Sequence, residues 1–273
     1  MSVARSIIRA SHPEPAVAVT AVAALLSFGL GRPWPGVVSA AACVLASQLS
    51  IGWVNDVLDA PRDASVGRTD KPVATGAVSR RLILVLGVSA AFLVAPLGFL
   101  SGVPAGLVAV LGLVSALLYD WPLKSTLVSV LPYAVSFACL PAFVVLGAGL
   151  DPPVWLLAAG ALLGAGAHFV NTLPDLDDDI STGVRGLPHL LGRRGSLLTA
   201  AVLLLLATVF LAFGPPGPPP LLFWPTLAVA LIVLGLGVRA MRRDPTSRTP
   251  FLAVIAVALI DVVFLLVSGL NLE

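Results

Sequence analysis

Long apolar runs separated by short polar breaks dominate the pattern of hydrophobic and polar positions along the chain. A helix that crosses a bilayer needs about 20 mostly apolar residues. The runs that approach this length predict nine transmembrane helices. They lie near residues 15–31, 36–58, 82–100, 104–121, 127–149, 153–173, 196–213, 221–240 and 250–270. We therefore expect an all-α, polytopic membrane protein.

The first apolar run follows Arg5 and Arg9, as the apolar part of a secretory signal peptide would. Eight further runs follow it, and no obvious cleavage motif of small residues separates it from them. We therefore expect this run to be a retained first helix.

Composition points to the same environment. Hydrophobic residues make up 58% of the 273 residues and charged residues only 11%, whereas soluble domains carry roughly 25% charge. The net charge of +2 gives no reason to expect a nucleic-acid partner. Cys43 and Cys139 both fall inside apolar runs, so we expect neither a disulfide framework nor a cysteine-bound metal.

The basic residues predict the orientation, because Lys and Arg collect on the cytoplasmic side of a membrane protein. With a cytoplasmic N-terminus and nine crossings, only Arg32 falls on the opposite face. This predicts an outside C-terminus and places the two longer polar loops on the cytoplasmic side. In a prokaryotic cell the membrane would be the plasma membrane.

Those two longer loops share a pattern. One runs from Asn55 to Gly76 and the other from Asn171 to Gly192, and they align without a gap at an offset of 116 residues. The matched pairs are Asn55 and Asn171, Asp59 and Asp175, Asp63 and Asp179, Gly67 and Gly183, Pro72 and Pro188, and Gly76 and Gly192.

The loops follow the second and sixth predicted spans, so the repeated units have the same direction. We expect pseudo-repeats over residues 15–124 and 127–240, completed by helix 250–270. The whole chain, 1–273, would then be one domain, a 4+4+1 bundle around a central cavity. The two loops would face each other across that cavity.

Acidic side chains crowd both loops. Asp56, Asp59 and Asp63 are spaced i, i+3 and i+7, so they share one face of a helix that continues from the second span. Asp175 and Asp179 repeat the arrangement. Crowded carboxylates repel one another unless cations neutralise them. Oxygen ligands of this kind suit Mg²⁺, which binds through a few carboxylates and substrate phosphates.

Basic residues lie beside the acids: Arg68, Lys71, Lys124 and Arg185. Acid, metal and base together predict a diphosphate site, because the metal bridges carboxylate to phosphate and the basic side chains contact the remaining oxygens. The alternative is that these are ordinary solvated loop charges. Two clusters in matching register favour the diphosphate site.

At these residues the sequence resembles the UbiA superfamily of intramembrane prenyltransferases. The first family signature, N-D-x-x-D-x-x-x-D, is matched by Asn55, Asp56, Asp59 and Asp63. The second, D-x-x-x-D, is matched by Asp175 and Asp179. A Tyr followed five residues later by Lys, in the loop after the fourth span, is matched by Tyr119 and Lys124. Lys71 departs from the pattern, since many members carry Arg there.

The resemblance implies an Mg²⁺-dependent reaction of an isoprenyl diphosphate. The metal would be held by Asp59, Asp63, Asp175 and Asp179, and Asp56 would complete the catalytic acids. The leaving diphosphate would be stabilised by Arg68, Lys71 and Lys124, with Tyr119 donating to it. The allylic cation would be captured by a lipophilic acceptor, which we expect to be aromatic. Further substrate contacts are expected from Gln48, Asn55, His168, Asn171 and Arg185.

Two polar residues inside apolar spans allow alternatives. His168 lies about two turns from Asp175, where it would orient an acceptor or take its proton, or would be hydrogen-bonded between helices. Asp261 falls near the middle of the last span. An ionisable group there is expensive, so it is either functional or paired with a buried polar group.

Two other functions share some of these features. An ion or proton transporter would also place acids in a helical bundle, but the acidic clusters lie at the cytoplasmic rim, and only Asp261 supports transport. A membrane terpene cyclase would ionise the same diphosphate and capture the cation within its own chain. A catalytically inert scaffold is disfavoured by the intact motifs.

Overall fold

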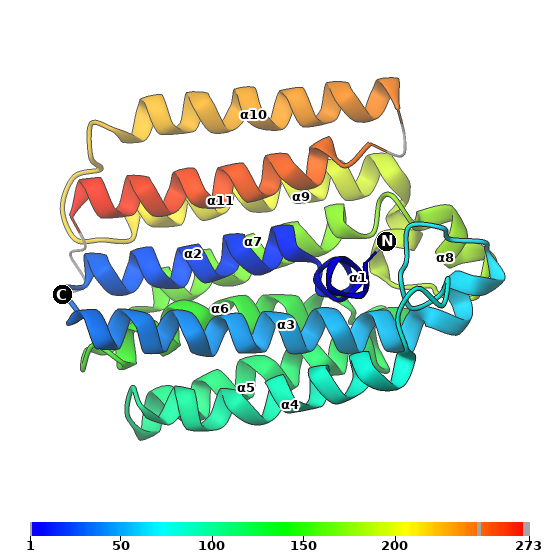
Figure 1. Ribbon diagram of the computed structural model, residues 1–273. Coiled ribbons are helices and arrows are strands. Elements are labelled where there is room, and N and C mark those ends of the chain that lie inside the picture. Colours follow the sequence, from blue (N-terminus) through cyan, green and yellow to red (C-terminus); the bar gives the residue numbers. More distant parts are fainter. Residues whose placement is uncertain (1, 245–246, 270–273) are drawn as a thin grey trace.

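Every regular element in the described part of the chain is a helix (Figure 1). The computed structural model describes residues 2–244 and 247–269. Its elements are α1 (Val3–Ala10), α2 (Pro13–Gly29), α3 (Trp34–Ser65), α4 (Arg80–Phe99), α5 (Val103–Asp120), η1 (Leu123–Ser125), α6 (Val130–Leu146), α7 (Val154–Asn171), α8 (Leu176–Ser181), α9 (Leu187–Phe213), α10 (Phe223–Arg243) and α11 (Thr249–Ser268). The prediction of an all-α fold is confirmed.

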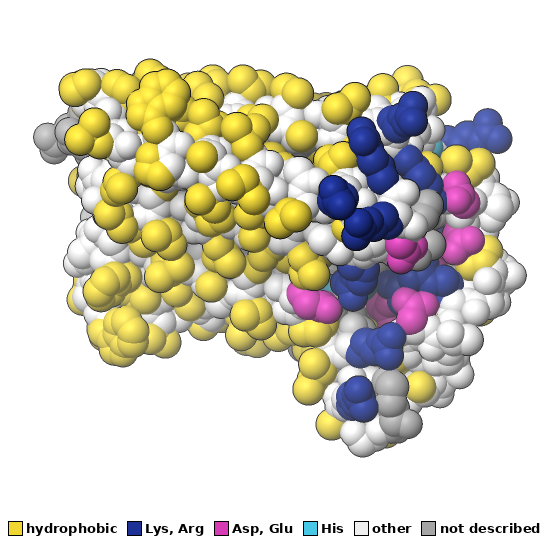
Figure 2. All heavy atoms as spheres, turned by 90° about the horizontal axis from the view of Figure 1, so that it is seen from above, with side chains coloured by type: hydrophobic (Ala, Val, Ile, Leu, Met, Phe, Trp, Pro, Cys, Tyr) yellow, Lys and Arg dark blue, Asp and Glu magenta, His cyan; other side chains and the backbone are white. Residues whose placement is uncertain are grey.

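Each predicted span coincides with one apolar helix. Within the described residues, seven helices are long and apolar enough to cross a bilayer, namely α3, α4, α5, α7, α9, α10 and α11. The other two, α2 and α6, are shorter apolar helices of 17 residues. Hydrophobic side chains spread along most of the face seen in Figure 2, as contact with lipid requires. The chain is an integral membrane protein.

Helix α3 is longer than its predicted span and carries the first acidic motif on its last turns. It runs on to Ser65 although Pro61 lies inside it. A proline inside a helix leaves the carbonyl four residues earlier without its usual donor. Here that carbonyl belongs to Val57, and the Nε of Arg80 donates to it at 3.1 Å. The first loop therefore begins as a rigid helix, as the spacing of its acids predicts.

The second acidic motif is built differently. Helix α7 ends at Asn171, and the separate short helix α8 begins after Asp175, which is its N-cap. Pro174 disfavours the helical conformation at Leu173, so the chain turns there. Arg193 then donates to the Leu173 carbonyl at 2.7 Å. The expectation that the second motif continues its span as one helix is wrong, because the proline breaks it.

The long helices lie side by side, and their connections fall at two ends of the bundle (Figure 1). Helix α10 forms one edge and α4 with α5 the opposite edge, while the short α1 runs across the long axes. Neighbouring pairs include α2 with α3, α3 with α4, α5 with α6, α6 with α7, α7 with α9, and α11 with α2, α7 and α10.

Small residues bring α6 and α7 close together. A Cβ on Gly164 would lie 2.5 Å from the Cβ of Phe137 and 2.6 Å from the carbonyl oxygen of Tyr133. A Cβ on Gly160 would lie 2.6 Å from the Phe137 carbonyl oxygen. The two glycines therefore form a close-packing face. This packing fixes Tyr133 on the wall of the interior cavity.

Asp261 is fully buried between α11 and α9. The Thr208 hydroxyl lies 3.0 and 3.2 Å from its two carboxyl oxygens. Asp261 is absent from the residues that line the cavity. The structure therefore supports pairing with a buried polar group rather than contact with substrate.

Gly164→Ala tests the close approach of α6 and α7. We expect the added methyl group to lower the stability by about 1–3 kcal/mol, the usual cost of overpacking, and to lower the thermal unfolding temperature in detergent. Gly235→Ala on α10 is the control, because a Cβ there meets nothing within 4 Å. It should leave that temperature unchanged or raise it. Equal behaviour of the two variants would contradict the packing argument.

Candidate active site

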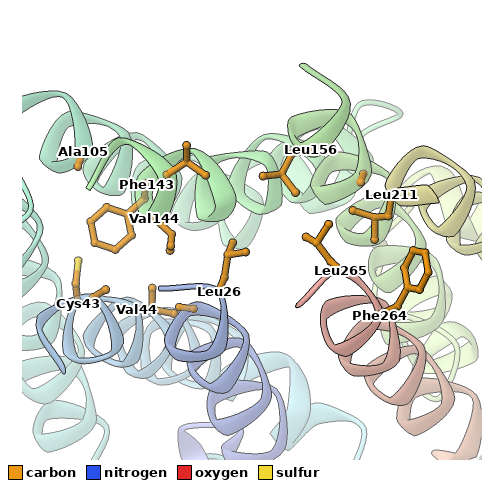
Figure 3. Close-up of a cluster of buried hydrophobic side chains, with 14 of the residues drawn as sticks. Leu26, Cys43, Val44, Ala105, Phe143, Val144, Leu156, Leu211, Phe264 and Leu265 are labelled. Carbon is orange, nitrogen blue, oxygen red and sulfur yellow. The ribbon is translucent and has the colours of Figure 1, made fainter. Parts of the chain in front are cut away.

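One large cavity of about 790 Å³ runs into the bundle from the end that carries the two acidic motifs. Figure 2 shows Lys, Arg, Asp and Glu side chains gathered at one end of the molecule. The far part of the cavity is apolar. Leu26, Phe143, Leu156 and Leu265, from four different helices, converge there (Figure 3). The cavity therefore joins a charged end to a hydrocarbon-like interior.

Two acids of the first motif, Asp56 and Asp59, pair with basic residues from two loops and from α3 itself. Asp59 pairs with Lys124 and with Arg62, the latter at 2.9 Å. Asp56 accepts a hydrogen bond from Lys71 at 3.1 Å. All three acids of the motif are buried, with exposed fractions of 8% or less. Burial of Asp56 and Asp59 as carboxylates requires such partners, because an unpaired buried charge is costly.

The second motif faces the first. The Nη2 of Arg62 lies 2.9 Å from Asp59 and 3.5 Å from Asp179, so this arginine contacts both motifs. Arg68, from the loop after α3, pairs with Asp175. The expectation that the two loops meet across a shared cavity agrees with these contacts.

Asp70 orients Arg68. Its two oxygens accept from Nε and Nη2 of that guanidinium at 2.8 and 2.9 Å, a bidentate pair. These hydrogen bonds lower the pKa of Asp70 to about 2. The remaining nitrogen, Nη1, is left to contact Asp175.

His189, at the start of α9, orients Asp179. The amide of Gly186 donates to its Nδ1 at 3.0 Å. In the neutral ring the proton is then on Nε2, which lies 3.3 Å from the Asp179 carboxylate and donates to it. The sequence pattern does not reveal this role, because His189 lies ten residues from its partner in a loop that turns back.

His12 reaches the site from the other side, at the junction between α1 and α2. Its backbone is left-handed, with φ of 51°, which is uncommon outside glycine. The junction rests directly on α3, because a Cβ on Gly52 would lie 2.4 Å from the Ser11 carbonyl oxygen. The His12 Nε2 lies 3.4 Å from the Lys71 ammonium. Burial, and then the charge of Lys71, lower the pKa of His12 to about 3, so the neutral ring accepts from Lys71.

Asp120 is a further acid of the cavity wall that spacing does not single out. It is buried at the end of α5 and accepts from the Asn55 side chain at 3.0 Å. Asn55, expected to contact substrate, thus also anchors Asp120. The second carboxylate oxygen of Asp120, Oδ2, is buried without a hydrogen-bond partner among the described residues.

Most of the predicted site residues do meet in the cavity. Its wall includes Gln48, Asn55, Asp59, Asp63, Arg68, Lys71, Tyr119, Lys124, Asn171, Asp175 and Asp179. Three predicted residues lie off the wall: Asp56, His168 and Arg185. Asp56 lies behind it and holds Lys71, while Arg185 is exposed at the surface.

His168 is a buried residue between helices. Its Nε2 lies 3.0 Å from the Ser129 hydroxyl, and its ring contacts those of Tyr119 and Tyr133 at centroid distances of 5.3 and 5.1 Å. Tyr133 in turn accepts from the Asn171 amide at 3.1 Å. Of the two alternatives for His168, the interhelical hydrogen bond agrees with this placement. The ring supports the two tyrosines that form the wall.

The acids fit Mg²⁺ as ligands. Asp63 Oδ2, Asp56 Oδ2 and Asp120 Oδ2 are buried without a hydrogen-bond partner in the described part of the chain. No three His, Cys, Asp or Glu side chains within that part converge closely enough to enclose a metal. Mg²⁺ is commonly held by one or two carboxylates together with water and substrate phosphates. The arrangement suits that mode rather than a closed protein cage.

Comparison with known proteins gives one consistent family. The sequence model of the UbiA prenyltransferase family matches residues 16–265. A digeranylgeranylglyceryl phosphate synthase from Natronomonas pharaonis is 29% identical over 259 residues, which cover 89% of this chain and 90% of that protein. A 4-hydroxybenzoate octaprenyltransferase from Chromohalobacter salexigens is 31% identical over 183 residues, covering 64% and 60%.

The fold is also that of a solved structure. A UbiA homologue from Archaeoglobus fulgidus bound to GPP and Mg²⁺ superposes with a TM-score of 0.74 at 12% identity, covering 96% of this chain and 99% of that one. At this identity the likeness concerns the fold.

Arg62→Gln tests whether the two motifs share a cation. The change leaves Asp59 and Asp179 facing each other with less positive charge between them, so the unfolding temperature in detergent with EDTA should fall. If the acids bind Mg²⁺, adding Mg²⁺ should reduce the difference in unfolding temperature between the variant and wild type. Arg81→Gln, at an exposed position on α4, is the control. If the unfolding temperature of Arg62→Gln lies equally far below that of wild type with and without Mg²⁺, these acids do not bind the metal.

Proposed function

Since the chain belongs to the UbiA prenyltransferase family, we propose that it transfers a prenyl group from an isoprenyl diphosphate to a lipophilic or aromatic acceptor, with Mg²⁺ as cofactor. The observation that carries this proposal is the pair of facing acidic motifs at the mouth of an apolar cavity. A diphosphate needs the charged end, and an isoprenoid tail needs the apolar interior.

The acidic and basic residues of the site have different proposed roles. Mg²⁺, when bound, supplies the charge that joins the acids to the diphosphate, and Asp59, Asp63, Asp175 and Asp179 are its proposed ligands. Arg68 and Lys124 already contact two of these acids, and Lys71 contacts the neighbouring Asp56. All three line the cavity, where they would contact the remaining phosphate oxygens. Such preorganised positive charge stabilises the pyrophosphate as it leaves.

Bond changes follow from that arrangement. The allylic C–O bond breaks with both electrons going to pyrophosphate, and the acceptor's nucleophilic atom then bonds to the cation and loses a proton. Tyr119 lies on the cavity wall near Lys124 and is proposed to donate to the leaving group. The apolar wall excludes water, which would otherwise capture the cation.

The topology is part of the same proposal. We infer nine crossings with a cytoplasmic N-terminus, so that the acidic motifs face the cytoplasm, and a 4+4+1 repeat. Matching backbone conformations support the repeat: the paired glycines Gly67 and Gly183 have φ of 73° and 86°, and Gly76 and Gly192 have φ of 72° and 65°. A positive φ at both pairs is a shared backbone feature, although Gly192 lies at a kink inside α9 and Gly76 lies in a turn before α4.

Cysteine labelling tests the orientation. Thr69→Cys places a thiol in the exposed loop beside the acidic motifs, and Asp151→Cys places one in an exposed loop after α6. Cys43 and Cys139 are buried and give a low background. In intact cells a membrane-impermeant maleimide should label the cysteine at 151 and spare the one at 69 until the cells are opened. The reverse labelling would refute a cytoplasmic site.

Asp59→Ala and Asp175→Ala test the metal ligands. Each substitution should lower kcat at least about 100-fold, the usual effect of removing one group that stabilises charge in the transition state. The variant protein should still elute as a folded species in detergent. Asp151→Ala, an exposed acid away from the site, should keep full activity. Retained turnover in either site variant would refute the assignment.

The first assay of function is Mg²⁺-dependent release of pyrophosphate from geranylgeranyl diphosphate by the purified protein. Release that requires an acceptor supports a prenyltransferase. Release without an acceptor, accompanied by cyclic hydrocarbon products, would indicate a terpene cyclase instead. No release with donors of any chain length would refute the proposed reaction.

A further inference from the structure

Ser129 is fully buried at the start of α6, and its side chain does not cap that helix. A serine at the N-cap commonly accepts a hydrogen bond from an amide of the first turn, but within the described residues the Ser129 hydroxyl makes no such bond. Instead the Leu187 amide, at the start of α9, donates to this hydroxyl at 3.1 Å. Nε2 of His168 on α7 lies 3.0 Å from the same oxygen. One hydroxyl group therefore joins three segments that are distant in the sequence.

Gly186 brings the start of α9 against the loop that carries Lys124. A Cβ at Gly186 would lie 2.5 Å from the Lys124 carbonyl oxygen and 2.9 Å from the Ser129 hydroxyl oxygen. The φ of Gly186 is −76°, which any residue can adopt. Space rather than backbone conformation therefore requires a glycine here. We refer to the contacts of Ser129 with His168 and Leu187, and of Gly186 with Lys124, as the Ser129 junction.

The Ser129 junction leads to both acidic motifs. On one side, the Lys124 side chain pairs with Asp59 of the first motif. On the other side, the Gly186 amide donates to Nδ1 of His189 at 3.0 Å, and Nε2 of that ring lies 3.3 Å from Asp179 of the second motif. One packed contact between two loops therefore holds a basic residue of the first motif beside the histidine that orients the second.

The first turns of α9 are not held in place by the rest of that helix. Gly192 interrupts α9 with φ of 65° and ψ of 178°, so residues 187–191 form a separate helical piece, which carries the orienting histidine. The Ser196 hydroxyl crosses this kink and donates to the Pro188 carbonyl at 3.1 Å. The orientation of the piece depends further on contacts outside α9, and the Ser129 junction supplies them.

The Ser129 junction lies behind the cavity wall. Ser129, His168, Gly186 and Leu187 are absent from that wall in the described part of the chain, so a bound substrate would not touch them. Arg62, which also ties the two motifs together, lines the cavity. An incoming metal and diphosphate would compete with Arg62 for its acids. The hydrogen bonds of Ser129 are outside that competition and would persist when the site is filled.

From these contacts we infer that Ser129 is a positioning residue of the diphosphate site. Its hydroxyl holds the start of α9 against the Lys124 loop and thereby fixes Asp179, through His189, relative to Lys124. The inference rests on the proposed function and deepens it, because it concerns the same site. A diphosphate that joins both motifs through Mg²⁺ requires a set separation between them, since electrostatic stabilisation of this kind depends on groups that are already in place.

The test measures the affinity for inorganic pyrophosphate at saturating Mg²⁺, by calorimetric titration of the purified protein in a neutral detergent. Neither donor nor acceptor is added, so the measurement requires no turnover. Ser129→Ala removes the hydroxyl that contacts His168 and Leu187. Ser115→Ala is the matched control. Its hydroxyl is also buried and donates to the Pro132 carbonyl at 3.0 Å, between α5 and α6, but Ser115 lies off the cavity wall and outside the Ser129 junction.

We expect Ser129→Ala to weaken pyrophosphate binding about threefold to tenfold, the range that one lost hydrogen bond commonly produces. Both Ser129→Ala and Ser115→Ala should lower the unfolding temperature in detergent, because each removes a buried hydrogen bond. Ser115→Ala should nevertheless keep an affinity for pyrophosphate within about twofold of wild type. Equal affinities of the two variants would overturn the inference.

A double-mutant cycle with His189→Ala shows whether Ser129 acts through the second motif. His189→Ala removes the contact with Asp179 directly. Because the two changes act on the same path, Ser129→Ala/His189→Ala should bind pyrophosphate no more than about twofold more weakly than the weaker of the single variants. Losses that multiply would show that Ser129 acts independently of His189, and the inference would be wrong.

Gly186→Ala disturbs the Ser129 junction from the opposite side, since the added methyl group would meet the Lys124 carbonyl and the Ser129 hydroxyl. It should weaken pyrophosphate binding by a similar factor. If Ser129→Ala does not fold, Gly186→Ala takes its place in the cycle with His189→Ala, and the same criterion decides. Wild-type affinity in a folded Gly186→Ala protein would contradict the inference.

Failure of the proposed function has a different signature. Wild type would then bind pyrophosphate with Mg²⁺ but prenylate no acceptor, and the affinities of the variants would still decide the inference. If wild type binds no pyrophosphate in the presence of Mg²⁺, the inference itself fails, because there is then no diphosphate site for Ser129 to position.

Discussion

Two arginines hold the charged end of this cavity together. Arg62 contacts acids of both motifs, and Arg68, oriented by Asp70, reaches the second motif from the loop after α3. Without these contacts the acids would repel one another at the end of an apolar bundle, where the low dielectric strengthens the repulsion. The position of α8 and the path of residues 66–79 follow from this pairing. The position of the cavity mouth follows from it as well, because α8 and residues 66–79 form opposite sides of the opening.

The same pairing explains why one end of the cavity differs so strongly from the other. The basic and acidic side chains pair with each other at the charged end, and the far part of the wall is apolar. A substrate with a diphosphate head and a hydrocarbon tail can enter in one orientation only. In the proposed reaction, the reactive carbons would lie at the boundary between the two regions, where the charges would stabilise the departing anion and the wall would exclude water.

The sequence predicts the parts of the site that are periodic or repeated, and misses those that depend on tertiary contacts. Spacing and the offset between the loops identify Asp59, Asp63, Asp175 and Asp179. His12 is missed because its place depends on a left-handed turn that rests on a glycine of another helix. The two prolines carry the same local signal but act differently: Pro61 stays inside α3, since Arg80 bonds the freed carbonyl, whereas Pro174 ends the helical path. Only the fold reveals which proline has such a partner.

Asp261 shows how a polar residue in an apolar span is to be interpreted. Its position is the one sequence feature that favours transport, because an acid in the bilayer interior is expensive and has to be compensated. The structure supplies the compensation locally through Thr208 of the neighbouring helix, and Asp261 lies off the cavity wall. The acids at the charged end of the cavity, by contrast, contact basic residues from distant parts of the chain. Some of their carboxylate oxygens have no hydrogen-bond partner among the described residues. The free-energy cost of burying a carboxyl group therefore does not by itself identify a functional acid. A buried acid at the edge of a cavity, with a carboxylate oxygen that lacks a hydrogen-bond partner, is the better candidate.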